Sequence, residues 1–203
     1  MKMPKPKIKL PEPSFETCLL KIISERKSHR KYRKEPLALN ELSTVLWSSY
    51  GCIDEDCRRR TVPSAGATYP MEIFVFVREN GVIGLEPGIY YYDPLTHSII
   101  LIRSGDQNRK LYYACLNQKW VLEAPINIVI TAVYERTTSW YGRRGFRYIY
   151  MEAGHIGQNI YLAATNLGLG TVAVGAFNDE QIKTIIGLNN KYLVLYVFPI
   201  GKI

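Results

Sequence analysis

The sequence lacks the motifs that mark several common enzyme classes. It has no Gly-x-Ser-x-Gly segment, the strand-to-helix turn that carries the serine of α/β-hydrolases. It also has no Gly-x-x-x-x-Gly-Lys-Ser/Thr loop for binding nucleoside triphosphates. The segment 168–170 leaves a predicted helix and enters a predicted strand, which is the reverse of a dinucleotide-binding turn. The sequence therefore argues against a serine hydrolase, a P-loop enzyme and a Rossmann dehydrogenase.

Metal ligands are scarce as well. The chain has three histidines and four cysteines, and Cys52 and Cys57 have no second pair of ligands at zinc-site spacing, so we expect no metal site. No signal peptide opens the sequence, and no apolar run reaches the roughly 18 residues of a membrane span. These absences predict a cytoplasmic protein with no membrane partner, whose cysteines are free thiols.

Positive charge and aromatic rings, by contrast, are abundant. Lysines and arginines number 26 against 18 acidic residues, which gives a net charge of +8, and there are fifteen tyrosines. Such an excess fits an anionic ligand, nucleic acid or solubility alone. The basic residues are dispersed, with local groups at 58–60 and 143–147, and no nucleic-acid-binding signature is present. We therefore expect no nucleic-acid partner.

Helix and strand signals predict one α+β domain over residues 14–203, preceded by a Lys- and Pro-rich arm over residues 1–13. Hairpin and crossover connections together predict a central mixed or antiparallel sheet flanked by helices. Ser14 and Asn40 are the expected N-caps of the first two helices. The expected helices are 14–27, 39–50, 107–117, 147–167 and 179–186, and the expected strands are 73–77, 88–94, 98–103, 126–134, 171–174 and 193–198.

The predicted helix 147–167 has one side of small residues, including Gly154 and Gly157. Each glycine costs about 1 kcal/mol relative to alanine in an exposed helix. We therefore expect the backbone to approach another helix or a cofactor closely at these positions.

Three segments could hold a ligand, although each also has an ordinary structural explanation. Residues 26–30 offer forked cations and a hydroxyl, as a phosphate requires, or a solvated helix end. Residues 63–70 contain small side chains that let a flat ligand approach, or form a tight turn. Residues 168–177 could present bare backbone N–H groups, or cap a helix ahead of an edge strand.

The order of these segments resembles that of the flavin nitroreductases, from about residue 24 to residue 203. Within that family the set is most similar to the SagB-type dehydrogenase branch, which includes enzymes that oxidise thiazolines and oxazolines in ribosomal peptides. The motifs that carry the resemblance are Arg26–Tyr32, Pro36–Leu37, Leu42–Trp47, Tyr50–Gly51, Thr61–Pro70, Tyr150–Asn159, Gly168–Thr171 and Pro199–Lys202.

The resemblance implies the nitroreductase fold and a homodimer with FMN at the subunit interface. Arg26, Lys27 and Ser28 would contact the phosphate and the ribityl chain, and Lys202 would lie near the phosphate. Arg30 would lie at the O2/N1 edge of the flavin, where a cation stabilises the negative charge of the reduced ring.

The resemblance also implies the residues around the flavin ring itself. Four residues of one loop would come from the partner subunit, namely Pro63, Ser64, Ala65 and Gly66. Two would contact the pyrimidine end of the ring, namely Asn117 and Gln118. Four more would line the ring with backbone N–H groups aimed at N5 and O4, namely Ala173, Val174, Gly175 and Ala176.

The implied activity is ping-pong hydride transfer from NAD(P)H through flavin N5 to a small electron acceptor. Tyr141 would be a proton relay on the substrate side, or a packing residue. Azoline-oxidising members have a Lys-Tyr pair where this chain has Trp140-Tyr141, which argues against azoline oxidation. A peptide-modifying thiazoline/oxazoline dehydrogenase and a non-catalytic FMN-binding protein are the alternatives.

Overall fold

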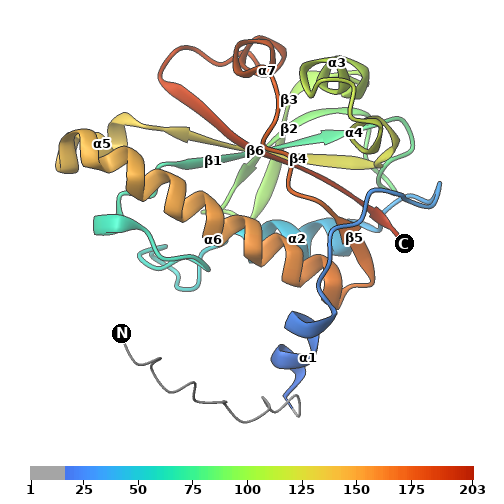
Figure 1. The fold of residues 1–203 in the computed structure, drawn as a ribbon, viewed down its shortest axis with the longest axis horizontal. Helices are drawn as coiled ribbons and strands as arrows, with labels where there is room; N and C mark the ends of the chain where they lie inside the picture. The colour runs from blue at the N-terminus through green and yellow to red at the C-terminus, as the bar shows by residue number, and fades with distance from the viewer. Residues whose placement is uncertain (1–16) are drawn as a thin grey trace, which may run out of the picture.

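The structure, a computed structural model, describes residues 17–203, in which a six-stranded sheet carries helices on both faces (Figure 1). The strand order is β3-β2-β1-β4-β6-β5, and every neighbouring pair is antiparallel. The predicted α+β fold is confirmed, and the sheet is antiparallel rather than mixed. The strands are β1 (Met71–Val77), β2 (Gly88–Asp93), β3 (Ser98–Ser104), β4 (Ile126–Val133), β5 (Leu169–Thr171) and β6 (Tyr192–Lys202).

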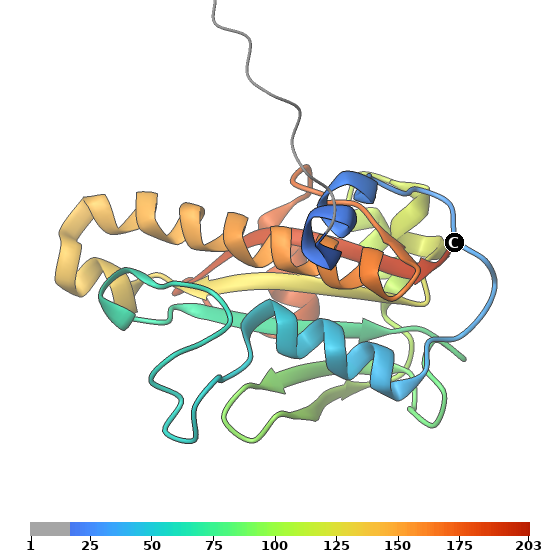
Figure 2. The same cartoon turned by 90° about the horizontal axis from the view of Figure 1, so that it is seen from below.

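The helices are distributed over the two faces of the sheet. Helices α2 and α6 cover one face, and α3 and α7 cover the other (Figures 1 and 2). Among the helices of residues 17–203, none combines the length and the apolar composition that crossing a bilayer requires. The helices are α1 (Cys18–Glu25), α2 (Leu39–Tyr50), α3 (Asn108–Ala114), α4 (Lys119–Glu123), α5 (Glu135–Tyr141), α6 (Gly145–Asn166) and α7 (Asp179–Ile186).

Strand β1 shows how the sequence builds two cores. All seven of its residues are buried. Ile73, Val75 and Val77 pack into the cluster under α2 and α6, while Phe74 and Phe76 pack into the cluster under α3 and α7. Side chains alternate between the faces of a strand, so a strand buried on both faces is mostly apolar, and the one charged residue of β1, Glu72, pairs with Arg136.

The predicted helix caps need correction. The 1–13 arm and Ser14 lie outside the described residues, and Thr17 is the N-cap of α1, where its side chain accepts a hydrogen bond from the N–H of Leu20. The N-cap of α2 is Ala38 rather than Asn40. The Glu41 carboxylate accepts the Ala38 N–H at 2.7 Å and so supplies the capping group.

The sequence analysis missed two short helices and placed the bounds of one helix and one strand wrongly. The helix predicted over 107–117 ends at Ala114, because Leu116 and Asn117 adopt left-handed backbone conformations with φ of 55° and 61°. Helices α4 and α5 were missed, since five and seven residues are too few to display a helical period. The strand predicted over 171–174 lies instead at 169–171, where it pairs with the end of β6.

Helix α6 approaches the sheet closely at Gly157. An ideal Cβ at Gly157 would lie 2.9 Å from Cζ of Phe198. At Gly154, an ideal Cβ would have no neighbouring atom within 4 Å among the described residues. At Gly157 the close approach is to a side chain of the sheet, Phe198 of β6, rather than to another helix or a cofactor as expected, while Gly154 faces open space.

We expect Gly157→Ala to lower the free energy of unfolding by about 1–3 kcal/mol, because the added methyl overpacks against Phe198. The matched control is Gly154→Ala on the same helix, which we expect to raise it by up to about 1 kcal/mol through helix propensity. Urea unfolding followed by circular dichroism measures both changes. Equal effects at the two positions would contradict this packing.

Candidate functional site

The first predicted segment runs beside the third. After α1, the chain passes along the end of the sheet, where the N–H of His29 donates to the carbonyl of Thr171 at 2.9 Å. Four residues later, the N–H of Arg33 donates to the carbonyl of Lys202, also at 2.9 Å. Residues 26–33 are therefore held against β5 and β6, next to the Gly168–Phe177 segment.

Tyr161 of α6 joins these two segments. Its hydroxyl accepts the N–H of Ala173 at 2.8 Å and lies 2.9 Å from the hydroxyl of Ser28. The Arg26 guanidinium lies over the Tyr161 ring, 5.1 Å from its centroid. If the Tyr161 proton points to Ser28, the proton of Ser28 is left for an outside acceptor. We call Arg26, Ser28, Tyr161 and Ala173 the Tyr161 cluster.

A second set of contacts extends this site. Arg30 lies over the ring of Trp120, with its guanidinium carbon 5.4 Å from the ring centroid. The side-chain amide of Gln118 donates to the carbonyl of Ala176 at 2.8 Å. Asn117 is exposed beside it. Two of the three segments singled out in the sequence, residues 26–30 and 168–177, therefore meet residues 117–118 at one end of the molecule.

Backbone N–H groups are available where the chain leaves the sheet. Val174 is bonded in both directions to Val197, and its side chain is buried in the core rather than exposed. Gly175 and Ala176 follow and are exposed. No group within residues 17–203 accepts a hydrogen bond from either N–H, so both are free to bind a ligand.

The Pro63–Gly66 loop lies elsewhere in the chain. The hydroxyl of Ser64 donates to Glu152 of α6 at 2.6 Å and accepts the N–H of Tyr69 at 3.0 Å. Glu152 precedes Tyr161 by nine residues, which is roughly 14 Å along a helix. The loop and the Tyr161 cluster of one chain therefore lie along different parts of α6.

The buried carboxylate of Glu152 on α6 holds this loop through hydrogen bonds. This carboxylate also accepts the Tyr50 hydroxyl at 2.8 Å, and that hydroxyl accepts the N–H of Met71 at 3.3 Å. Burial raises the pKa of Glu152, although the hydrogen bonds from Ser64 and Tyr50 and the charge of Arg60 partly oppose the rise. The network fixes the loop to α6 and engages the Ser64 side chain.

Tyr141, the predicted catalytic residue, packs against the same loop. Gly66 has a φ of +59°, and an ideal Cβ there would lie 2.6 Å from the Tyr141 hydroxyl oxygen. The Tyr141 ring also meets Tyr148 edge-on, with centroids 5.0 Å apart. A side chain at position 66 would therefore collide with Tyr141, and glycine permits both the turn and the contact.

Lys202 is held by a carboxylate in this structure. Its ammonium pairs with Glu41, which also binds the N–H of Ala38. Burial alone would raise the pKa of Glu41, but the hydrogen bonds from Lys202 and Ala38 outweigh it and lower that pKa. The predicted contact of Lys202 with a phosphate would require it to exchange this partner.

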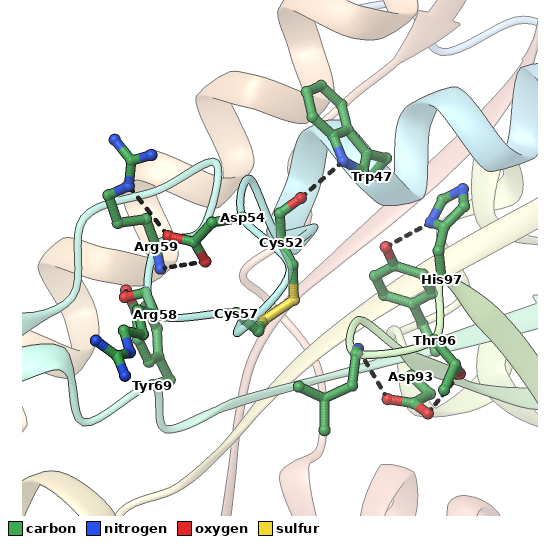
Figure 3. The surroundings of a disulfide bond; sticks show 12 residues. Trp47, Cys52, Asp54, Cys57, Arg58, Arg59, Tyr69, Asp93, Thr96 and His97 are labelled. Atoms are coloured by element: carbon green, nitrogen blue, oxygen red, sulfur yellow. Dashed lines mark hydrogen bonds and ion pairs between the residues drawn. A yellow bond between two sulfur atoms is a disulfide. The ribbon is translucent and has the colours of Figure 1, made fainter.

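The expectation of free cysteines is wrong for one pair. Cys52 and Cys57 form a disulfide that closes a short loop after α2 (Figure 3). An antiparallel bridge between Cys52 and Arg60 turns the chain back on itself. The Cα atoms of Cys52 and Cys57 lie 4.8 Å apart, a distance that a disulfide spans. Cys18 and Cys115 are free thiols.

Two contacts flank this disulfide. Trp47 donates its indole N–H to the Cys52 carbonyl, and Asp54 accepts from the side chain of Arg59 (Figure 3).

Among the described residues, no group of three His, Cys, Asp or Glu side chains is placed to hold a metal ion.

The chain is similar to an archaeal protein over nearly its whole length. A candidate nitroreductase of Methanocaldococcus jannaschii is 48% identical over 191 residues, which are 94% of each chain. The microcin B17-processing protein McbC of Escherichia coli is 24% identical over 163 residues, 78% of this chain and 59% of McbC. The match with McbC supports the resemblance to the SagB-type branch.

Solved structures share the fold. The E. coli microcin synthetase McbBCD complex with bound truncated pro-MccB17 aligns with a TM-score of 0.76 at 22% identity, covering 97% of this chain and 78% of that one. The NADPH:FMN oxidoreductase from Vibrio harveyi, complexed with NAD+, aligns with a TM-score of 0.65 at 18% identity, covering 91% and 68%. The model of the nitroreductase family matches residues 23–202. By its fold and by this match, the chain belongs to the nitroreductase family.

Proposed function

We propose that the protein is a homodimeric FMN-dependent oxidoreductase that uses NAD(P)H as electron donor. The observation that carries the proposal is the Tyr161 cluster, which gathers a guanidinium and a hydroxyl at one end of the fold, next to the free N–H groups of Gly175 and Ala176. Bound FMN would supply hydride transfer from NAD(P)H to a small acceptor in a ping-pong cycle.

The groups at this site suit the chemistry of FMN. Arg26 and Ser28, with Lys27 between them, would bind the phosphate through charge-assisted hydrogen bonds. Arg30 would put a cation where reduction adds negative charge, and its stacking on Trp120 fixes the guanidinium. The N–H groups of Gly175 and Ala176 would donate to the ring edge, and Asn117 and Gln118 would approach its pyrimidine end.

Dimerisation would complete the site. The Pro63–Gly66 loop lies roughly 14 Å along α6 from the Tyr161 cluster of its own chain, so we infer that it serves the cofactor of the partner. Because the Ser64 hydroxyl is engaged by Glu152, the loop would act through its backbone and its small residues. The exposed side chains of Tyr150 and Met151 would contribute to the subunit interface on α6.

The proposal is tested by purifying the protein and identifying any bound flavin by its absorbance. We expect near-stoichiometric FMN, and anaerobic addition of NADPH or NADH should bleach the flavin band within seconds. Reoxidation by a quinone or a nitroaromatic compound would complete the cycle. FMN that neither nucleotide reduces would overturn NAD(P)H as the electron donor and leave a non-catalytic FMN-binding protein or a peptide dehydrogenase.

A second candidate is favoured by the match with McbC, which is a peptide-processing protein. In that reading, electrons would pass from a peptide azoline to FMN and on to oxygen. Trp140 argues against it, because indole cannot remove a proton as a lysine amine can. Loss of two hydrogens from a thiazoline peptide, detected by mass spectrometry, would support this candidate.

A further inference from the structure

A cationic and aromatic surface surrounds the turn between α5 and α6. Trp140 is 81% exposed, although it is among the most hydrophobic side chains. Arg143, Arg144 and Arg147 follow within seven residues and are all exposed. In the part of the chain that the structure describes, none of these arginines forms an ion pair. We call these four residues the Arg-Trp patch.

The backbone concentrates this charge. A short 3₁₀ turn over Gly142–Arg144 joins the two helices, and Gly142 has a φ of +54°. The two acidic residues that flank the patch in sequence are engaged elsewhere: Glu135 pairs with Lys191, and the buried Glu152 accepts hydrogen bonds from Tyr50 and Ser64. The patch therefore carries an uncompensated charge of about +3, which attracts an anion.

The patch lies beside the loop assigned to the partner's cofactor. Tyr141 packs on Gly66, and the hydroxyls of Thr137 and Thr68 lie 2.9 Å apart. Arg136 also donates to the carbonyl of Tyr69. Helix α5 is thus fastened to residues 64–69, and a ligand on the Arg-Trp patch would lie next to the proposed flavin site.

We propose that the Arg-Trp patch binds the adenosine end of NADPH, with the arginines on its 2′-phosphate and Trp140 stacked on the adenine. The inference rests on the proposed function and adds a preference for NADPH over NADH. A phosphate monoester presents oxygens that guanidinium groups bind in forked pairs. An acidic peptide could also bind the arginines, but it offers no planar group to stack on the exposed indole, whereas the adenine base does. NADH lacks this 2′-phosphate, so it gains less from the arginines than NADPH does.

A binding measurement tests the patch without flavin chemistry. Adenosine 2′,5′-bisphosphate and adenosine 5′-monophosphate are titrated into the FMN-loaded protein by calorimetry. We expect the bisphosphate to bind at least tenfold more tightly. Arg143→Ala/Arg144→Ala should weaken its binding at least tenfold, and Trp140→Ala should weaken both ligands. Arg103→Ala, at an exposed arginine on the edge strand β3, is the matched control and should change neither.

Equal binding of the two nucleotides, or unchanged binding in the double variant, would overturn the proposal. So would tighter capture of polyglutamate than of the bisphosphate. In a parallel assay, the ratio of kcat/KM for NADPH to that for NADH should fall at least tenfold in the double variant. Flavin reduction with no preference between nucleotides would refute the patch alone. Selective bisphosphate binding without flavin reduction would refute the hydride-transfer function and leave the patch as a nucleotide site.

Discussion

Arg26→Ala protein is expected to lose most of its FMN during purification, with the dissociation constant rising about 10- to 100-fold. Arg26 is the guanidinium of the Tyr161 cluster, stacked on the Tyr161 ring beside the Ser28 hydroxyl. Removing a charge-assisted hydrogen bond to a phosphate costs about 1.5–3 kcal/mol, which corresponds to that change in affinity. Flavin fluorescence quenching on titration into apoprotein measures the constant.

Two companion variants separate binding from packing. Tyr161→Phe keeps the ring under Arg26 but removes the hydroxyl that binds Ala173, so we expect a smaller loss of FMN affinity, of about 1 kcal/mol. Arg103→Ala removes a surface charge away from the site and should bind FMN as the wild type does. Full FMN retention by Arg26→Ala, with an unchanged circular dichroism spectrum, would show that the phosphate is bound elsewhere.

Glu152→Ala is expected to lower the free energy of unfolding by about 2–4 kcal/mol. The hydroxyls of Tyr50 and Ser64 both donate to this carboxylate and would lose their acceptor in a buried place. An unsatisfied buried donor costs about 1–3 kcal/mol. Chemical denaturation measures the change, and limited proteolysis within residues 60–70 should accelerate as the loop detaches. A loss below about 0.5 kcal/mol would contradict this role.

The pH dependence of stability tests the charge of Glu152 separately. Burial raises its folded-state pKa above the ordinary value of 4.5, so the folded protein holds this proton more tightly than the unfolded chain does. The contribution to stability is fully present below about pH 4.5 and is lost as pH rises through the folded-state pKa. The stability of the wild type relative to Glu152→Gln should therefore fall between pH 4 and pH 8. A difference that rises over this range would contradict the assignment.

Sequence patterns predicted the bounds of a helix best where the helix's own residues determine them. Helices α2 and α7 occur at the residues expected from their patterns. The meeting of residues 26–30 with residues 168–177 followed from the order of motifs, because each segment alone has an ordinary explanation. The antiparallel pairing of β4 with β6 could not be read from composition, since composition does not specify which strands pair or in which direction.

The contacts that were missed join residues distant in sequence. Tyr161 lies 133 residues from Ser28, and nothing in its helical surroundings distinguishes it from the other tyrosines. The engagement of Ser64 by Glu152 and of Lys202 by Glu41 likewise depends on tertiary packing. The disulfide was missed because four intervening residues give no indication that the chain folds back between Cys52 and Arg60.

The position of β6 inside the sheet has a consequence for how the chain folds during synthesis. Strand β6 pairs with β4 on one side and β5 on the other, yet it is translated about sixty residues after β4. Until residues 192–202 emerge from the ribosome, the apolar strand β4 presents an unpaired edge. Non-local pairing of this kind folds slowly and leaves an intermediate that can aggregate. A nascent chain stalled before residue 192 should therefore bind chaperones that shield exposed strands, and release them once β6 is inserted.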